Sequence, residues 1–91
     1  MIFMKKEYVK KSSIWAEQFD GSKAMAEKYN VVSTTVGDDY GVPGGPLMLY
    51  TITTLEGGLR IQIGDWIATG VNGEHWPIQD KIFKATYEPV E

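Results

Sequence analysis

The segment IGDWIATGVNGEHWPI, residues 63–78, decides the fold because it places two turn signals between runs of strand-forming residues. Gly64-Asp65 fits a turn that opens a strand. Asn72-Gly73 fits a two-residue type I′ turn, in which both central residues have positive φ. Because Pro77 has no N–H to donate to a ladder, the returning strand should lie at the edge of a sheet or end there. The segment therefore predicts a β-hairpin.

A second hairpin is predicted just before this segment. The runs LMLYTITT (47–54) and LRIQI (59–63) are rich in strand formers and flank LEGG. In the second run, alternation points Leu59, Ile61 and Ile63 toward the core. After residue 78, QDKIF is expected to form one helical turn, and KATYEPV the last strand.

The N-terminal half combines strands with one helix. SSIWAEQF is predicted to be a strand with apolar contacts on both sides, where Trp15 and Phe19 share a face. Ser22 is a suitable N-cap for a helix through KAMAEKY, and Asn30 tolerates the left-handed conformation that closes helices. VVSTTV is β-branched and predicts a further strand.

These elements predict an α+β fold, a bent antiparallel β-sheet or small partial barrel with one short helix. The 91 residues fit a single domain, 1–91, because so short a chain needs all of its apolar surface in one core. Residues 37–46, GDDYGVPGGP, are expected to form a flexible loop. With no cysteine, stability must come from packing rather than disulfides.

Composition excludes some classes of function. The net charge of −3 argues against general nucleic-acid binding, which needs a basic face. A local exception is a lysine cluster near the N-terminus, which is either a solvated end or a contact for nucleic acid or an acidic partner: Lys5, Lys6, Lys10 and Lys11. No apolar run has transmembrane length and the start does not resemble a signal peptide, so no membrane contact is expected. No GxGxxG or P-loop pattern indicates a cofactor.

Trp66 and Trp76 admit two interpretations. They are expected near the ends of paired strands, where a cross-strand aromatic pair would stabilise the hairpin. Alternatively they form an exposed platform that stacks a base or a sugar. Alternation puts His75 on the opposite face from Trp76, in solvent. No second His, Cys or fixed-spacing carboxylate motif accompanies His75, so neither a metal site nor a catalytic role is predicted.

Aspartates in turns are the remaining candidates. Asp38 and Asp39 are adjacent in the 37–46 loop, beside Tyr40, and Asp65 precedes the hairpin. Paired carboxylates can serve hydrolysis or bind Mg²⁺. Aspartates in such positions more often cap turns through their own backbone. The loop itself is either a simple connection or a flap over a partner or ligand.

Three segments together carry a family resemblance: IWAEQFDG (14–21), TLEGGLRIQIGDWIATGVNGEHWPI (54–78) and IFKATYEPV (82–90). They resemble a widespread family of small phage and prophage proteins whose C-terminal block has the order GDWI, GVxGE, YP, IF, TYEPV. The resemblance covers about two thirds of the chain. It implies a phage or prophage origin and a place in the host cytoplasm or the virion, and it brings no established activity.

The chain departs from that family pattern at three places. His75 stands where the family tends to have an aromatic residue, Ile78 stands where a cysteine is common, and a Pro-Asp pair is missing at Asp80 and Lys81. A mechanism that needed the cysteine could not operate here. The shared features are therefore interpreted as structural or binding features.

The sequence thus predicts a non-enzymatic phage accessory protein that self-associates or binds a host or virion macromolecule. The alternatives are a small-ligand or nucleotide-binding module that uses the tryptophans and the loop, and a small carboxylate-dependent enzyme. No catalytic residue, metal or cofactor is assigned. The binding candidates are Trp66, Trp76, His75, Asp65, Asp38, Asp39 and Tyr40.

Overall fold

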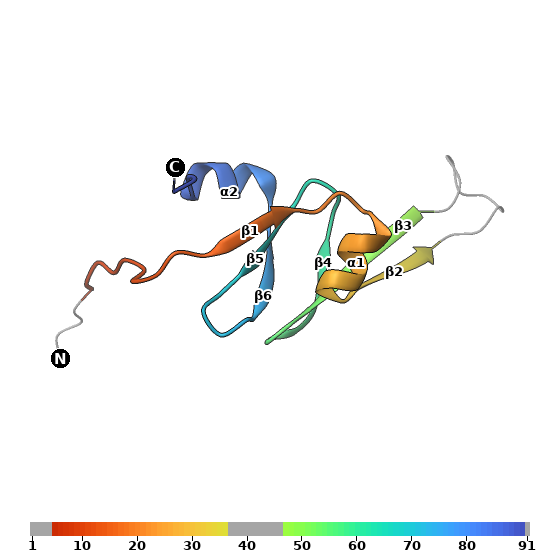
Figure 1. The fold of residues 1–91 in the computed structure, drawn as a ribbon, viewed down its shortest axis with the longest axis horizontal. Helices are drawn as coiled ribbons and strands as arrows, with labels where there is room; N and C mark the ends of the chain where they lie inside the picture. The colour runs from red at the N-terminus through yellow and green to blue at the C-terminus, as the bar shows by residue number, and fades with distance from the viewer. Residues whose placement is uncertain (1–4, 37–46, 91) are drawn as a thin grey trace.

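A computed structural model describes residues 5–36 and 47–90 (Figure 1). Within these residues, two helices and six strands follow each other: β1 (Trp15–Gln18), α1 (Lys23–Tyr29), β2 (Val31–Val36), β3 (Leu47–Thr54), β4 (Gly57–Ile61), β5 (Trp66–Thr69), β6 (His75–Ile78) and α2 (Asp80–Thr86). The α+β class and the antiparallel strands are confirmed. Two expectations were inexact, because the described strands form two sheets with no closed barrel, and there are two short helices rather than one.

Helix α1 begins and ends as predicted. Ser22 is its N-cap, and the hydroxyl oxygen accepts a hydrogen bond from the backbone N–H of Met25 at 3.2 Å. Asn30 ends the helix in the left-handed conformation, with φ 56° and ψ 45°. This reversal leads the chain directly into β2, and the side chain of Tyr29 at the end of the helix is buried.

The first sheet has the strand order β1-β5-β6, with both pairs antiparallel. Pro77 lies in β6, which is an edge strand as predicted. Backbone hydrogen bonds from Phe19 N–H to the Asp65 carbonyl and from Gly64 N–H to the Phe19 carbonyl, both 2.8 Å, join the end of β1 to the turn before β5. The register pairs Ala68 with both Ala16 and Trp76, so these three residues share one face.

The loop between β5 and β6 differs from the predicted two-residue turn. Gly73 donates to the Gly70 carbonyl at 3.1 Å, and Gly70 donates to the Glu74 carbonyl at 2.9 Å. Gly73 has φ 79°, whereas Asn72 does not have positive φ. A type I′ turn needs positive φ at both positions, so the type I′ prediction was wrong. The loop has three residues, with glycine in the left-handed position.

The second sheet has the order β2-β3-β4. The predicted hairpin of β3 and β4 is confirmed, with Thr54 paired to Gly57 across the turn. The predicted inward face is confirmed only at Ile61, which is buried. Leu59 is 39% exposed and Ile63 is 60% exposed, because Leu59 lies near the hairpin tip and Ile63 lies beyond the end of the strand.

One apolar core joins the two sheets and α1. Among the described residues its buried side chains are Phe19, Tyr29, Val31, Ile52, Ile61 and Ile67. Met25 and Ala26 of α1 pack against them, as does Tyr50 of β3. Trp15, predicted to share a face with Phe19, is 83% exposed, because the chain enters the core only at Phe19, directly after β1.

The C-terminal segment is helical where a strand was predicted. Residues 80–86 form α2, and the described chain after it contains no strand. Phe83 and Tyr87 are four residues apart, a helical spacing that brings both rings to one side. Within the described residues, neither helix is long and apolar enough to cross a membrane.

Candidate functional site

Trp66 anchors α2 to the first sheet. Its ring stacks on Phe83 with the centroids 4.2 Å apart and the planes at 11°. Its indole N–H donates to Asp80 Oδ1 at 2.8 Å. This hydrogen bond, and a second one from Lys84, hold the pKa of the Asp80 carboxyl below its ordinary value of 3.8. Both the apolar ring and the polar N–H of Trp66 therefore make contacts within the molecule.

Trp76 lies on the same face of the sheet but does not contact Trp66 as a cross-strand partner. It is opposite Ala68, whereas Trp66 is opposite Ile78, so the two tryptophans are diagonal neighbours on paired strands rather than a directly opposed pair. The Lys10 ammonium lies 5.3 Å from the ring centroid of Trp76 and also 5.3 Å from that of Tyr87. It donates to the Tyr87 hydroxyl at 3.0 Å. Lys10 is thus engaged by aromatic groups.

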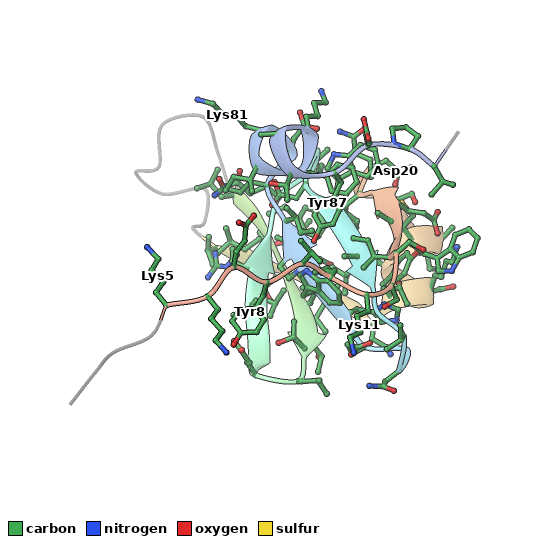
Figure 2. The ribbon with its side chains drawn as sticks, turned by 90° about the vertical axis from the view of Figure 1, so that its left-hand side faces the viewer. Lys5, Tyr8, Lys11, Asp20, Lys81 and Tyr87 are labelled. Atoms are coloured by element: carbon green, nitrogen blue, oxygen red, sulfur yellow. The ribbon has the colours of Figure 1, made fainter. Side chains whose placement is uncertain are left out.

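The rings of Trp66, Phe83 and Tyr87 form a continuous stack, with 5.3 Å between the centroids of the last two. Figure 2 shows Tyr87 between α2 and the N-terminal segment, while Lys5 projects away from the sheets. This aromatic cluster attaches the N-terminal segment and α2 to the outer face of the first sheet. The arrangement explains the tryptophans as packing residues, although each remains half-buried.

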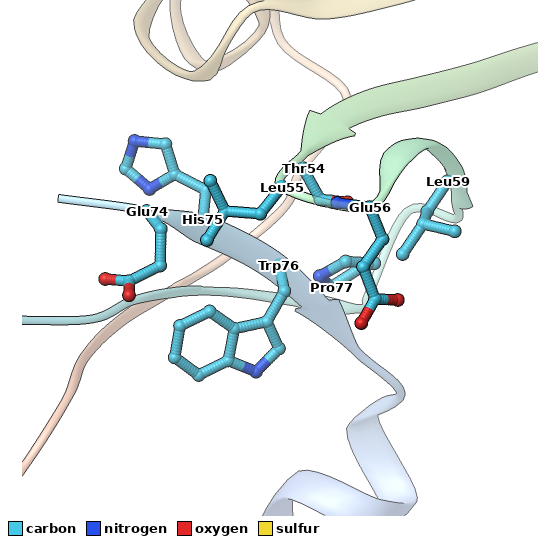
Figure 3. Close-up of a pocket in the computed structure, with 8 residues that line it drawn as sticks. All are labelled: Thr54, Leu55, Glu56, Leu59, Glu74, His75, Trp76 and Pro77. Carbon is cyan, nitrogen blue, oxygen red and sulfur yellow. The ribbon is translucent and has the colours of Figure 1, made fainter. Parts of the chain in front are cut away.

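A groove of about 310 Å³ separates β6 from the tip of the β3–β4 hairpin (Figure 3). Its apolar lining comes from Leu55, Leu59, Trp76 and Pro77, and Glu56 and Glu74 add carboxylates. Glu74 is partly occupied, because its Oε1 accepts a hydrogen bond from the Asn72 backbone N–H at 3.0 Å. Grooves of this size are at the small end of ligand sites. The lining suits a small cation with an apolar body better than an anion.

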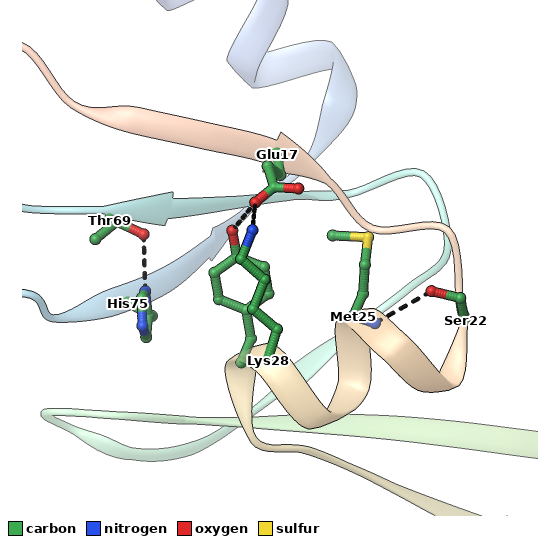
Figure 4. Close-up of polar contacts among 7 residues, drawn as sticks. Glu17, Ser22, Met25, Lys28, Thr69 and His75 are labelled. Carbon is green, nitrogen blue, oxygen red and sulfur yellow. Dashed lines mark hydrogen bonds and ion pairs between the residues drawn. The ribbon is translucent and has the colours of Figure 1, made fainter.

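His75 points to the opposite side of β6 from Trp76, as alternation predicted (Figure 3). The predicted solvent exposure was wrong, because the ring is half-buried against Tyr29, with centroids 5.0 Å apart and planes at 89°. Its Nδ1 forms a 2.8 Å hydrogen bond with Thr69 Oγ1 (Figure 4). This face of β6 lies against Tyr29 of α1, a contact that strand periodicity alone does not reveal.

Glu17 is the centre of a polar cluster beside His75. One carboxylate oxygen accepts hydrogen bonds from the Lys28 ammonium and the Tyr29 hydroxyl (Figure 4). These two hydrogen bonds hold the pKa of Glu17 below its ordinary value of 4.5, and the one from Lys28 has the larger effect. Burial raises the pKa of Tyr29 above its ordinary value of 10.0, and the hydrogen bond to the Glu17 carboxylate adds a smaller increase. The cluster connects β1 to α1 and has no free nucleophile.

Asp65 caps a turn through the backbone, which is the structural interpretation given for the turn aspartates. Its Oδ2 accepts from the Gln62 backbone N–H at 2.9 Å, and its own N–H donates to the Gln62 carbonyl at 3.0 Å. Asp38, Asp39 and Tyr40 lie outside the described residues, as does the 37–46 loop. Within residues 5–36 and 47–90 no group of three or more His, Cys, Asp or Glu side chains could hold a metal ion.

Sequence reasoning missed four residues that organise the site: Glu17, Tyr29, Phe83 and Tyr87. Lys10 was named only as part of the N-terminal lysine cluster, and its contacts with Trp76 and Tyr87 were not predicted. The i, i+4 spacing of Phe83 and Tyr87 was a usable signal for a helix with an aromatic face. Glu17 and Lys28 had no such signal, since an ion pair between a strand and a following helix depends on how the two elements pack.

No protein-family model, curated protein or solved structure matches the chain. The resemblance to the phage and prophage family therefore stays a prediction.

Proposed function

We propose that this protein is a non-enzymatic interaction module, a phage or prophage accessory protein that associates with itself or with another macromolecule. The observation that carries the proposal is the apolar surface left outside a small core. Val32 and Leu47, which are 60% and 61% exposed, lie on one face of the second sheet according to the register of β2 with β3. Trp15 of the first sheet is 83% exposed at a separate place. Exposed apolar side chains that gather on one region are typical of association surfaces.

The polar groups of the described residues support the same proposal. Three carboxylates outside the groove are occupied by structural contacts: Glu17 by α1, Asp65 by its turn, and Asp80 by Trp66. A general acid or base needs a reachable, suitably tuned carboxylate or imidazole. Here the pKa values of Glu17 and Asp80 are lowered, so both remain ionised at neutral pH.

The test is sedimentation of the purified chain over a wide concentration range, together with affinity capture from infected host cells. We expect a concentration-dependent oligomer, or one macromolecule captured reproducibly. The captured molecule should also bind when both components are purified, and it should be lost when Trp15 or Leu47 is replaced by Ser. A strictly monomeric chain that captures nothing would contradict the proposal.

A second candidate function rests on the groove beside β6. Its apolar lining and the Glu56 carboxylate favour a small organic cation, whereas a nucleotide phosphate would be repelled by Glu56 and Glu74. A ligand that binds the folded state raises the melting temperature. We expect quaternary ammonium or aromatic amine probes to raise it in the wild type and not in Trp76→Ala. Equal shifts in both proteins, or none in either, would remove this candidate.

A further inference from the structure

The β2 strand is an uncharged edge strand of the second sheet, and no described strand pairs with its outer side. Its sequence, VVSTTV, pairs on one side with β3, whose sequence is LMLYTITT. Neither strand contains a charged residue. Short segments of β-branched residues that lack charge and proline pair readily with further strands. In β2 the four residues 32–35 are exposed in succession.

Other edges of the two sheets carry features that discourage pairing. β6 contains Pro77, which cannot donate a backbone hydrogen bond, and β6 lies beside the β3–β4 hairpin. β1 carries Glu17, which is bound to Lys28 of α1. β4 contains Arg60 and begins with two glycines. Charges, proline and short, interrupted strands are the usual protections of an edge, and β2 has none of them.

The direction of the β2 backbone groups follows from the register. The two-residue turn of Leu55 and Glu56 makes Thr54 and Gly57 the hydrogen-bonding pair that closes the β3–β4 hairpin. Alternate residues of β3 therefore bond to β4, and those between them bond to β2. Through the β2–β3 register, the backbone N–H and C=O groups of Val31, Ser33 and Thr35 point away from β3, toward the open edge.

We propose that this edge of β2 pairs antiparallel with β2 of a second copy of the chain, around a two-fold axis at Ser33. Centred there, Ser33 faces its own copy and Val31 faces Thr35 of the partner copy, so all three outward-facing residues pair. Shifting the axis to residue 32 or 34 pairs only two of the three. The favoured register forms about six backbone hydrogen bonds and joins the second sheets into one sheet of six strands.

The occupant is a second copy because the edge is complementary to itself. The pairing brings no like charges together, since β2 has no charge, and it places Val32 opposite Thr34 of the partner copy on the outer face. Val36 and Leu47 lie on this same face, according to the register with β3. Depletion of charge is typical of the centre of protein interfaces. This inference rests on the proposed function and names its partner.

The chain has no cysteine, so a single introduced cysteine can be cross-linked only to the same residue of a second copy. Cross-linking therefore reports the distance between these two equivalent residues in the dimer. In Ser33→Cys the two Cα atoms would lie about 5.5 Å apart, within reach of a disulfide or a short bis-maleimide. In Thr35→Cys they would lie about 14 Å apart, because the two residues are offset by four positions along the paired strands, and a disulfide cannot bridge that distance. We expect a covalent dimer from Ser33→Cys on oxidation and little from Thr35→Cys.

A charge at the axis provides the second measurement. Ser33→Lys would set two ammonium groups opposite each other and should weaken the dimer roughly tenfold or more in sedimentation. Thr53→Lys is the matched control, because Thr53 is an exposed threonine of β3 beyond the β2 register, and it should leave the dimer unchanged. Circular dichroism and melting temperature establish that each variant is folded.

The outcomes separate this inference from the proposed function. A dimer that Ser33→Lys does not weaken, or equal cross-linking of both cysteine variants, overturns pairing at β2 and leaves the interaction module standing. A monomeric wild type also overturns pairing at β2, and the proposed function then depends on capture of another macromolecule. Selective cross-linking at Ser33 together with dissociation by Ser33→Lys supports both.

Discussion

Trp66 and Phe83 stack almost in parallel, 4.2 Å between centroids, and this contact attaches α2 to the first sheet. Replacing Phe83 by Ala removes both buried ring area and the stacking energy, about 1.5 kcal/mol for a half-buried ring. For a domain of this size we expect the melting temperature to fall by about 6–12 °C. Ile82→Ala, at an exposed position of the same helix, should change it little. Equal losses in the two variants would contradict the anchoring role.

The Glu17 cluster predicts a pH dependence of stability on the acid side. Because Lys28 and Tyr29 lower the folded-state pKa of Glu17 below 4.5, its contribution is complete above that value. It is lost as the pH falls through the lowered, folded-state pKa. Glu17→Gln should therefore be less stable than the wild type at neutral pH and approach it in acid. Urea unfolding at several pH values measures the difference, and a gap that stays constant with pH would refute the assignment.

The three-residue loop between β5 and β6 gives different costs at adjacent positions. Gly73 has φ 79° and open space where a Cβ would lie, so Gly73→Ala tests backbone strain alone. We expect a loss of about 1 kcal/mol of unfolding free energy. Asn72→Ala should cost much less, because Asn72 does not have positive φ. Comparable costs at both positions would instead indicate a type I′ turn.

His75 provides a test of packing against hydrogen bonding. His75→Phe keeps an aromatic ring against Tyr29 but loses the hydrogen bond with Thr69. Net hydrogen bonds contribute about 1 kcal/mol, whereas truncation also leaves a cavity. We expect His75→Phe to melt within about 8 °C of the wild type and His75→Ala to melt clearly lower. If His75→Phe were the more damaging change, the imidazole would have a role beyond packing.

Local sequence was sufficient where one residue's own chemistry decides the backbone. Ser22 begins α1 and Asn30 ends it, because a hydroxyl can cap N–H groups and asparagine tolerates the left-handed region. Pro77 marks an edge strand, since it lacks a donor. VVSTTV is a strand because its β-branched side chains favour extended backbone.

Local signals failed where two conformations have similar local cost. Asn72-Gly73 fits a two-residue turn as well as a three-residue loop, and only pairing with Glu74 selects the second. The C-terminal segment could extend as a strand, but as a helix it brings both Phe83 and Tyr87 toward the first sheet, where Phe83 stacks on Trp66. The energy of that contact is absent from the segment itself.

The sequence by itself determined the α+β class, most strand positions and the side of β6 to which His75 and Trp76 each point, because alternation is a property of the extended chain. Only the tertiary structure decided what covers each side. It divided the strands into two sheets and placed Tyr29 against His75. It also stacked Trp66 on Phe83 and paired Glu17 with Lys28. Periodicity fixes a direction for each side chain, but its partner comes from a distant element whose position depends on the whole core.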